Sequence, residues 1–147
     1  MSHARRTIRD RVVQVLEAAS VADTVSASRV HPLPADVLAA ALVYANSESV
    51  TGTTLSYPRT YHRELQLVVE VVSRDTRHLD DRLDNLCANV ENAIGADNTL
   101  GGLVKDCQLT DTALTMSFDG DAPIGAARMV FRTLYLTSET DAGSVVS

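Results

Sequence analysis

Aromatic residues are scarce in this chain: they make up 4% of its 147 residues, and tryptophan is absent. A surface that stacks the bases of single-stranded nucleic acid needs several aromatic rings, so such a surface is hard to assemble here. Sheets and helices packed through Val, Leu and Ala do not have this need. The composition therefore predicts an aliphatic core and argues against a base-stacking protein.

Cysteine is also scarce and occurs only at Cys87 and Cys107. The two positions form neither a CxxC motif nor the spacing of a metal site. Cys87 falls on the apolar side of a predicted helix. We therefore interpret both cysteines as small buried hydrophobic residues of a protein in a reducing compartment.

The chain lacks an excess of positive charge and lacks long apolar runs. Its net charge is -6 with a pI near 5.0, which argues against a phosphate-neutralising protein but is compatible with a local basic patch. No run approaches the roughly 18 apolar residues of a membrane span. The first residues carry no apolar signal-peptide core, so we expect a protein that is intracellular when made.

Motifs of catalysis are missing as well. The sequence contains no GxSxG elbow, no HExxH and no glycine-rich phosphate loop. Its histidines, His3, His31, His62 and His78, fall in a tail, a turn, a strand start and a helix start. We predict that the protein is not an enzyme and has no catalytic, cofactor-binding or metal-binding residues.

A group of acids invites a metal-site interpretation, which we do not favour. Asp75, Asp80, Asp81 and Asp84 lie near His78 at the start of a predicted helix. Negative charge is common there because the helix dipole favours it. Asp81 and Asp84 share one side of that helix while Asp80 is rotated away, so the acids indicate a helix start.

What the sequence does contain is a strand followed by a helix, spanning residues 60–94. Leu65, Leu67, Val69 and Val71 alternate as one face of a strand over 61–73. Helical spacing over 79–94 then places one apolar stripe on a helix. The stripe consists of Leu79, Leu83, Leu86, Cys87, Val90 and Ile94. Packing this helix across the sheet gives the core of a two-layer domain.

The remaining elements complete an α+β domain. We expect a first helix from an N-cap at Thr7 to about Ala19, and a C′ glycine at Gly95 after the second helix. The other segments are an extended stretch over 24–30, a proline turn over 31–34, an apolar strand over 37–46, a polar loop over 47–58, a turn over 96–104, a strand from 105 with a phase slip at 110–112, a turn over 119–123, a strand over 126–137 and a loose tail over 138–147.

Together these segments predict a mixed, mostly antiparallel sheet of four to five strands with two helices packed on one face. We expect one domain over residues 1–137 and a flexible C-terminal tail over 138–147. The second face of the sheet also carries apolar side chains, which favours contact with another subunit. The polar loop is long, so we expect it to become ordered against a neighbour. The predicted interface residues are Val50, Leu55, Arg63, Val68, Val72, Val130, Arg132 and Leu134.

Four arginines crowd the start of the first helix: Arg5, Arg6, Arg9 and Arg11. One interpretation is a basic cluster that contacts nucleic acid or an acidic partner surface. The alternative, which we favour, is a solvated helix face.

The order of the elements is similar to that of a known family. The matching residues are Arg6-Thr7-Ile8-Arg9 with Val12 and Leu16, Arg29-Val30-His31-Pro32-Leu33-Pro34, Arg63-Glu64-Leu65, Leu79-Asp80-Asp81 to Val90-Glu91, Leu100-Gly101-Gly102-Leu103-Val104, and Phe131-Arg132-Thr133-Leu134-Tyr135. Over about residues 5–137 the chain resembles the tail terminator (minor tail, or tail completion) proteins of long-tailed phages, the group of the lambda tail terminator. The apolar strand departs from this pattern with three consecutive alanines.

The resemblance implies a structural role in a virion, located at the head-proximal end of the tail and assembled in the host cytoplasm. Proteins of this family form a hexameric ring that caps the tail tube, ends tube polymerisation and provides the head-joining surface. Implied partners are further copies of the chain, the tail tube protein and a head-completion or neck protein, with DNA passing through the channel. Another neck component, such as a head-closure or connector protein, and a small intracellular enzyme or ligand-binding domain remain alternatives.

Overall fold

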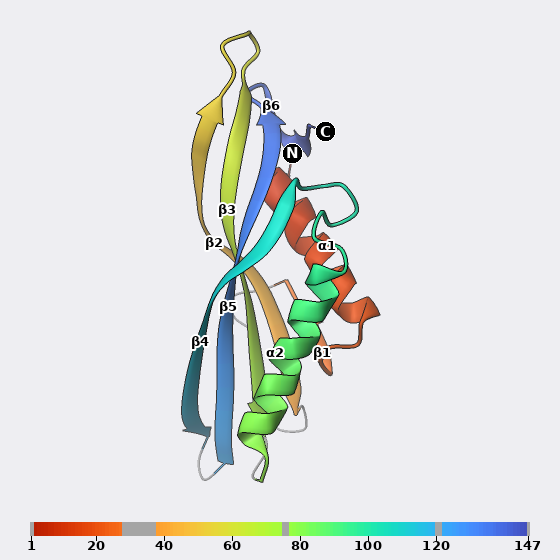
Figure 1. Cartoon of the computed structure of the whole chain (residues 1–147), viewed down its shortest axis with the longest axis vertical. Helices are drawn as coiled ribbons and strands as arrows, with labels where there is room; N and C mark the ends of the chain where they lie inside the picture. Colours follow the sequence, from red (N-terminus) through yellow and green to blue (C-terminus); the bar gives the residue numbers. More distant parts are fainter. Residues whose placement is uncertain (1, 28–37, 75–76, 120–121, 147) are drawn as a thin grey trace.

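The computed structural model describes residues 2–27, 38–74, 77–119 and 122–146 (Figure 1). Two helices and six strands follow one another in an α+β order. They are α1 (Ala4–Ala18), β1 (Thr24–Ser26), β2 (Ala39–Thr53), β3 (Thr60–Arg74), α2 (Leu79–Gly95), β4 (Asp106–Asp119), β5 (Ala122–Ser138) and β6 (Asp141–Val145).

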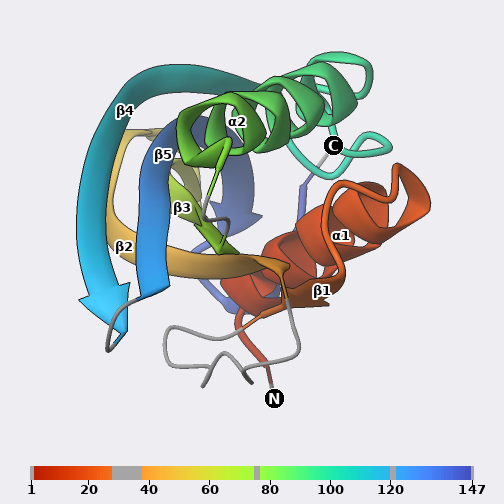
Figure 2. The same cartoon turned by 90° about the horizontal axis from the view of Figure 1, so that it is seen from below.

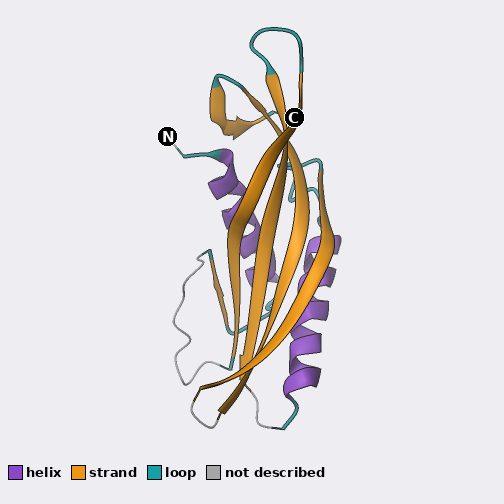
Figure 3. Ribbon diagram, turned by 90° about the vertical axis from the view of Figure 1, so that its left-hand side faces the viewer, coloured by secondary structure: helices purple, strands orange, loops and turns teal. Residues whose placement is uncertain are grey.

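The strands form a single sheet in the order β1-β2-β3-β5-β4, with β6 added to β5. β1 pairs with β2 in parallel, and the other neighbours pair antiparallel. Both helices lie on one face of this sheet, and the opposite face carries no helix (Figures 1 and 3). The predicted fold class is confirmed, although the sheet has six strands because the short β1 and β6 join it.

The core lies between the helices and the central strands. Leu65, Leu67, Val69 and Val71 of β3 are fully buried on the helix-covered face, as their alternation predicts. α1 buries Ala4, Ile8, Val12 and Leu16, and α2 buries the whole predicted stripe. Removing this apolar surface from water contributes about 25 cal/mol per Å², which makes the two-layer packing the main source of stability.

The predicted polar loop over 47–58 is wrong in extent. β2 continues to Thr53, and only residues 54–59 connect it to β3. Register shifts between Ala45 and Ser47 and between Val50 and Gly52 interrupt the ladder without ending it. Each bulge changes which face a residue occupies, so a polar segment with no regular alternation can still pair along its full length.

Both helices also differ from prediction at their ends. His3, not Thr7, is the N-cap of α1, and its Nδ1 accepts a hydrogen bond from the Arg5 backbone N–H at 3.1 Å. Gly95 is the last residue of α2 and not a C′ residue. The left-handed conformations occur later, in the turn that follows, at Leu100, Gly101 and Gly102.

The C-terminal segment is ordered where a loose tail was expected. Residues 141–145 form β6, which pairs with β5, and the Val146 N–H donates to the Leu136 carbonyl at 2.8 Å. β5 extends beyond the first residue of β4, which pairs with Leu134, and so offers this extra edge. His78 is the N-cap of α2 without a side-chain cap hydrogen bond. The predicted proline turn over 31–34 lies outside the described residues.

Candidate assembly surfaces

The β2–β3 hairpin projects beyond the rest of the molecule and ends in residues 54–59, here called the hairpin tip (Figure 1). Leu55 is 93% exposed and Tyr57 is 74% exposed. The Arg59 guanidinium lies 4.2 Å from the centre of the Tyr57 ring and donates to its hydroxyl at 2.5 Å. The Arg59 backbone N–H is bound in turn by Glu139 at 2.9 Å. The tip thus presents two large side chains to solvent on an ordered base.

A second uncovered apolar surface lies on the edge strand β4. The register shift between Leu109 and Asp111, which the phase slip predicted, changes the face that the following residues occupy. Leu114, Met116 and Phe118, here called the β4 stripe, therefore stand opposite Ala127, Gly125 and Pro123 on the helix-covered face. They are nevertheless 61%, 54% and 70% exposed.

The cause of this exposure is the shape of the sheet. Viewed along the long axis, the end of β4 curls away from α2, so the helix does not cover it (Figure 2). A groove of about 450 Å³ remains between helix and strand, here called the α2/β4 groove. It is lined by Asp80, Leu83, Asp84, Leu114, Thr115 and Met116. Its floor is apolar and its helix side carries two carboxylates.

A polar network lies on the helix-covered face between the start of α1 and the sheet, away from the α2/β4 groove. Glu48 accepts from Arg5 Nη1 at 2.6 Å, from Arg63 Nη1 at 2.9 Å and from the Tyr135 hydroxyl. Arg63 Nε also donates to Thr137 at 2.7 Å. Burial, together with the hydrogen bond to Glu48, raises the pKa of Tyr135 well above its usual range. The network ties the start of α1 to three strands through charge-assisted bonds.

His3 belongs to the same region. Burial lowers its pKa from the ordinary value of 6.5, and the positive charges of Arg5 and Arg63 add to this effect while Glu48 opposes it. A neutral ring is also what the cap requires, since Nδ1 accepts a hydrogen bond from the Arg5 N–H. The surroundings therefore favour the neutral form of His3, which is the form that caps α1.

Comparison with solved structures finds this architecture in a virus-like particle. The chain is similar to a chain of a structure titled "Virion of native gene transfer agent (GTA) particle", with a TM-score of 0.53 and 17% sequence identity. The match covers 90% of this chain and 99% of that chain. At this identity the likeness shows a shared fold. No protein-family model and no curated protein matches the chain.

The predicted interface residues fall into three groups. Val50 and Leu55 are exposed near the end of the hairpin. Arg63 lies on the helix-covered face, inside the Glu48 network. The remaining five, Val68, Val72, Val130, Arg132 and Leu134, lie together on the helix-free face, where Val68 is 0% exposed and Val130 is 8% exposed.

Part of the apolar surface on the helix-free face is thus already buried within one subunit. Val68 stands between Tyr44 and Val130 in the sheet, and these neighbours cover it. Arg132 is exposed and forms an ion pair with Glu64 at 3.5 Å. A neighbouring subunit on this face would contact the edges of the apolar cluster of Tyr44, Val68 and Val130, and the polar side chains around it.

The four arginines of α1 do not act as one group. Arg5 turns toward Glu48, and Arg6 lies 4.0 Å from Asp10 on the helix surface. Arg11 donates weakly to Gln14 at 3.4 Å and packs near Gly101. Among the described side chains, the Nε atoms of Arg9 and Arg11 are buried without a hydrogen-bond partner. The predicted basic cluster is therefore divided between the Glu48 network and the helix surface.

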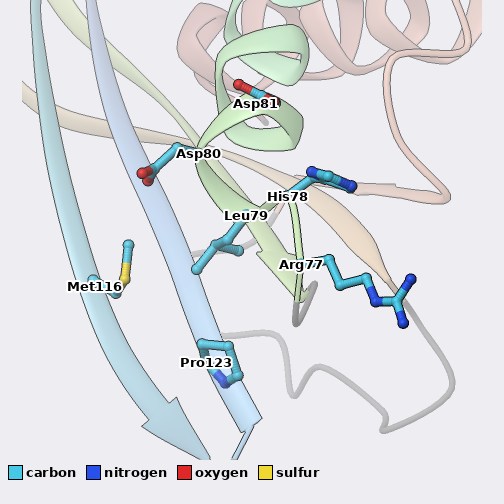
Figure 4. A pocket seen from close by; sticks show the side chains of 7 residues that line it. All are labelled: Arg77, His78, Leu79, Asp80, Asp81, Met116 and Pro123. Atoms are coloured by element: carbon cyan, nitrogen blue, oxygen red, sulfur yellow. The ribbon is translucent and has the colours of Figure 1, made fainter.

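Asp80, Asp81 and His78 border a pocket of about 400 Å³ at the start of α2. Asp84 lines the α2/β4 groove instead, and Asp75 lies outside the described residues. In Figure 4, Asp80 points toward β4 while Arg77 and His78 point to the opposite side, so the side chains diverge. Among the described residues, no cluster of three or more His, Cys, Asp or Glu side chains could hold a metal ion. The pocket has the geometry of a helix start beside a strand end.

Both cysteines are free and buried, as predicted. Burial raises the pKa of the Cys107 thiol to about 11, and burial with the charge of Asp84 raises that of Cys87. Both thiols are therefore protonated and poorly nucleophilic near neutral pH. In the described part of the chain, no helix is both long and apolar enough to cross a membrane.

Sequence reasoning missed the Glu48 network and the exposure of the β4 stripe. Glu48 falls in a polar segment whose bulges leave no periodic signal, so its inward direction cannot be read from the sequence. The alternation of Leu114, Met116 and Phe118 is typical of one face of a strand. What covers a strand face, however, depends on how far a distant helix reaches.

Proposed function

We propose that this chain is a structural virion protein of a phage-like particle. More specifically, it forms a ring that caps the tail tube, ends tube polymerisation and provides the surface for joining the head. The observation that carries this proposal is the match of nearly the whole fold to a chain of a gene transfer agent virion. The family resemblance over about residues 5–137 gives the finer role.

The surfaces of the molecule support an assembling protein. An ordered hairpin tip with exposed Leu55 and Tyr57, and an edge strand with three exposed apolar side chains, are costly in a monomer. Exposed apolar patches and open edge strands mark contact sites in soluble proteins. A ring would bury such surfaces between subunits.

The charge of the chain is compatible with a DNA channel. Six subunits of net charge -6 form an acidic ring. Negative potential repels DNA phosphates, so the genome passes through without specific binding. Further partners under this proposal are the tail tube protein on one side and a head-completion or neck protein on the other.

A measurement of oligomeric mass tests the ring directly. Light scattering after size-exclusion chromatography should give six times the chain mass of 15.8 kDa, and negative-stain images should show rings. Adding the protein to polymerising tube protein should shorten the tubes. A chain that stays monomeric at high concentration and in the presence of tubes would sink the proposal.

A second candidate is another component of the neck, because the shared fold does not distinguish positions within a virion. Immunogold labelling of assembled particles separates the two. Label between tube and head, together with unchanged tube length in polymerisation assays, would favour a head-closure or connector role.

A further inference from the structure

The two exposed apolar surfaces of this chain lie toward opposite ends of its long axis. The hairpin tip forms one end, and the α2/β4 groove lies near the other, where α2 begins (Figure 1). We propose that the hairpin tip of one copy docks into the α2/β4 groove of a second copy. This inference rests on the part of the proposed function that makes the chain self-assembling.

The shapes of the two surfaces are complementary. The tip is a narrow projection whose most exposed large hydrophobic side chain is Leu55, and the groove is a hollow of about 450 Å³ with Leu83, Leu114 and Met116 in its lining. Such a volume lies within the range of pockets that enclose small ligands, so it admits one or two large side chains. An apolar anchor in such a hollow is the usual centre of a protein interface.

The register of β4 indicates that the groove is an uncovered part of the core layer. Leu114 and Met116 stand opposite the buried Ala127 and Gly125 and therefore continue the core side of the sheet. α2 covers this layer over β5 but not over the end of β4 (Figure 2). An occupant of the groove completes the layer, and burying each large apolar side chain contributes about 1.5–3 kcal/mol.

The charges of the two surfaces are opposite. Within residues 50–59 the only charged side chain is Arg59, which also pairs with Glu139. Among the described residues that line the groove, the charged ones are Asp80 and Asp84. Tyr57 is held against the Arg59 guanidinium and so reaches the groove in a fixed position. A partner side chain ordered before binding loses less entropy on docking.

A contact between two different surfaces of one chain is heterologous. Each copy then offers one tip and one groove, and successive copies join head to tail until the rotation closes a ring. The matched shape and charge of the two surfaces within a single chain favour a second copy as the occupant over an unrelated protein.

The test compares the full chain with one tip variant, one groove variant and a matched control. Leu55→Ser removes the anchor, and the double variant Leu114→Ser, Met116→Ser removes the floor of the groove. Ala113→Ser changes an exposed residue of the same strand on the opposite face. Sedimentation velocity should show each interface variant with a Kd for self-association raised about tenfold or more, and the control unchanged.

Mixing the two interface variants gives the decisive result. Each retains one intact surface, so a one-to-one mixture should form heterodimers that neither variant forms alone. A mixture that stays monomeric, or single variants that assemble like the wild type, would overturn the docking proposal. Rings that persist in both variants would overturn it while leaving the proposed function intact, whereas a monomeric wild type would count against both.

A cross-linking experiment keeps the proposal testable if a variant is unstable. Leu55→Cys with Met116→Cys places thiols on tip and groove, and the native Cys87 and Cys107 are buried. Mild oxidation should give disulfide-linked multimers from the double variant and monomers from either single variant. Equal multimer yields from all three chains would contradict the contact.

Discussion

Glu48 joins three separate parts of the chain. It binds Arg5 of α1, Arg63 of β3 and Tyr135 of β5, and its side chain is only 10% exposed. A buried carboxylate is stable only when its partners offset the loss of water, so the network depends on all of its members. The bulge between Ala45 and Ser47 is what turns Glu48 to the inner face.

Replacing Glu48 with Gln should destabilise the fold strongly. The substitution leaves the largely buried guanidinium of Arg63, whose side chain is 11% exposed, without its counter-charge. Breaking a buried ion pair costs about 3 kcal/mol or more. Urea unfolding measures the change. Glu64→Gln is the matched control, because Glu64 pairs with the exposed Arg132 and should cost less than about 1 kcal/mol. Equal losses in the two variants would contradict the network.

His3 should make the stability of α1 sensitive to mild acid. Its pKa is lower in the fold than its ordinary 6.5, so between these values the unfolded chain binds more protons than the folded one. Stability is therefore lost as the pH falls from 6.5 through the folded pKa. His3→Asn keeps a cap oxygen and does not titrate. The wild type should lose more thermal stability than this variant between about pH 7.5 and about pH 5.

At the scale of elements, close packing of α2 on β5 depends on a small residue. A methyl group at Gly125 would lie 3.3 Å from side-chain carbons of both Leu79 and Leu83. The glycine is needed here for space beneath the first turns of α2. It sets how closely this end of the helix approaches the sheet, and so the position of one wall of the α2/β4 groove.

Gly125→Val should therefore move α2 away from the sheet at its start. Overpacking of this kind costs about 1–3 kcal/mol, which denaturant unfolding measures. Ala126→Val is the control, since Ala126 is only half-buried and faces the helix-free side. A Gly125 variant as stable as the control would show that the helix shifts freely.

At the scale of the whole molecule, one curved sheet carries distinct surfaces at its two ends and on its two faces. The hairpin reaches past the domain on one side, and β4 leaves its apolar stripe beyond α2 on the other (Figures 1 and 2). Neither surface contributes to the core of the monomer. Under the proposed function, stability and assembly are therefore separable.

Shortening the hairpin should remove self-association while lowering stability only modestly. Replacing residues 55–59 with Asn-Gly gives a two-residue turn that suits a β-hairpin, and the removed side chains lie outside the core. Because the contacts of Arg59 with Glu139 are lost, we expect the free energy of unfolding to fall by up to about 2 kcal/mol, with self-association lost in light scattering. Retained rings would mean that assembly uses other surfaces.

The sequence by itself determined the layers of this protein. Alternation along 61–73 and helical spacing along 79–94 placed the buried faces correctly, because periodicity directly reflects which side of an element meets the core. The tertiary structure alone decided three further features: the length of the hairpin, the inward turn of Glu48 and the exposure of Leu114, Met116 and Phe118. Bulges shift a face without a sequence signal, and coverage of an edge strand depends on the curvature of the sheet and the reach of a helix elsewhere in the chain.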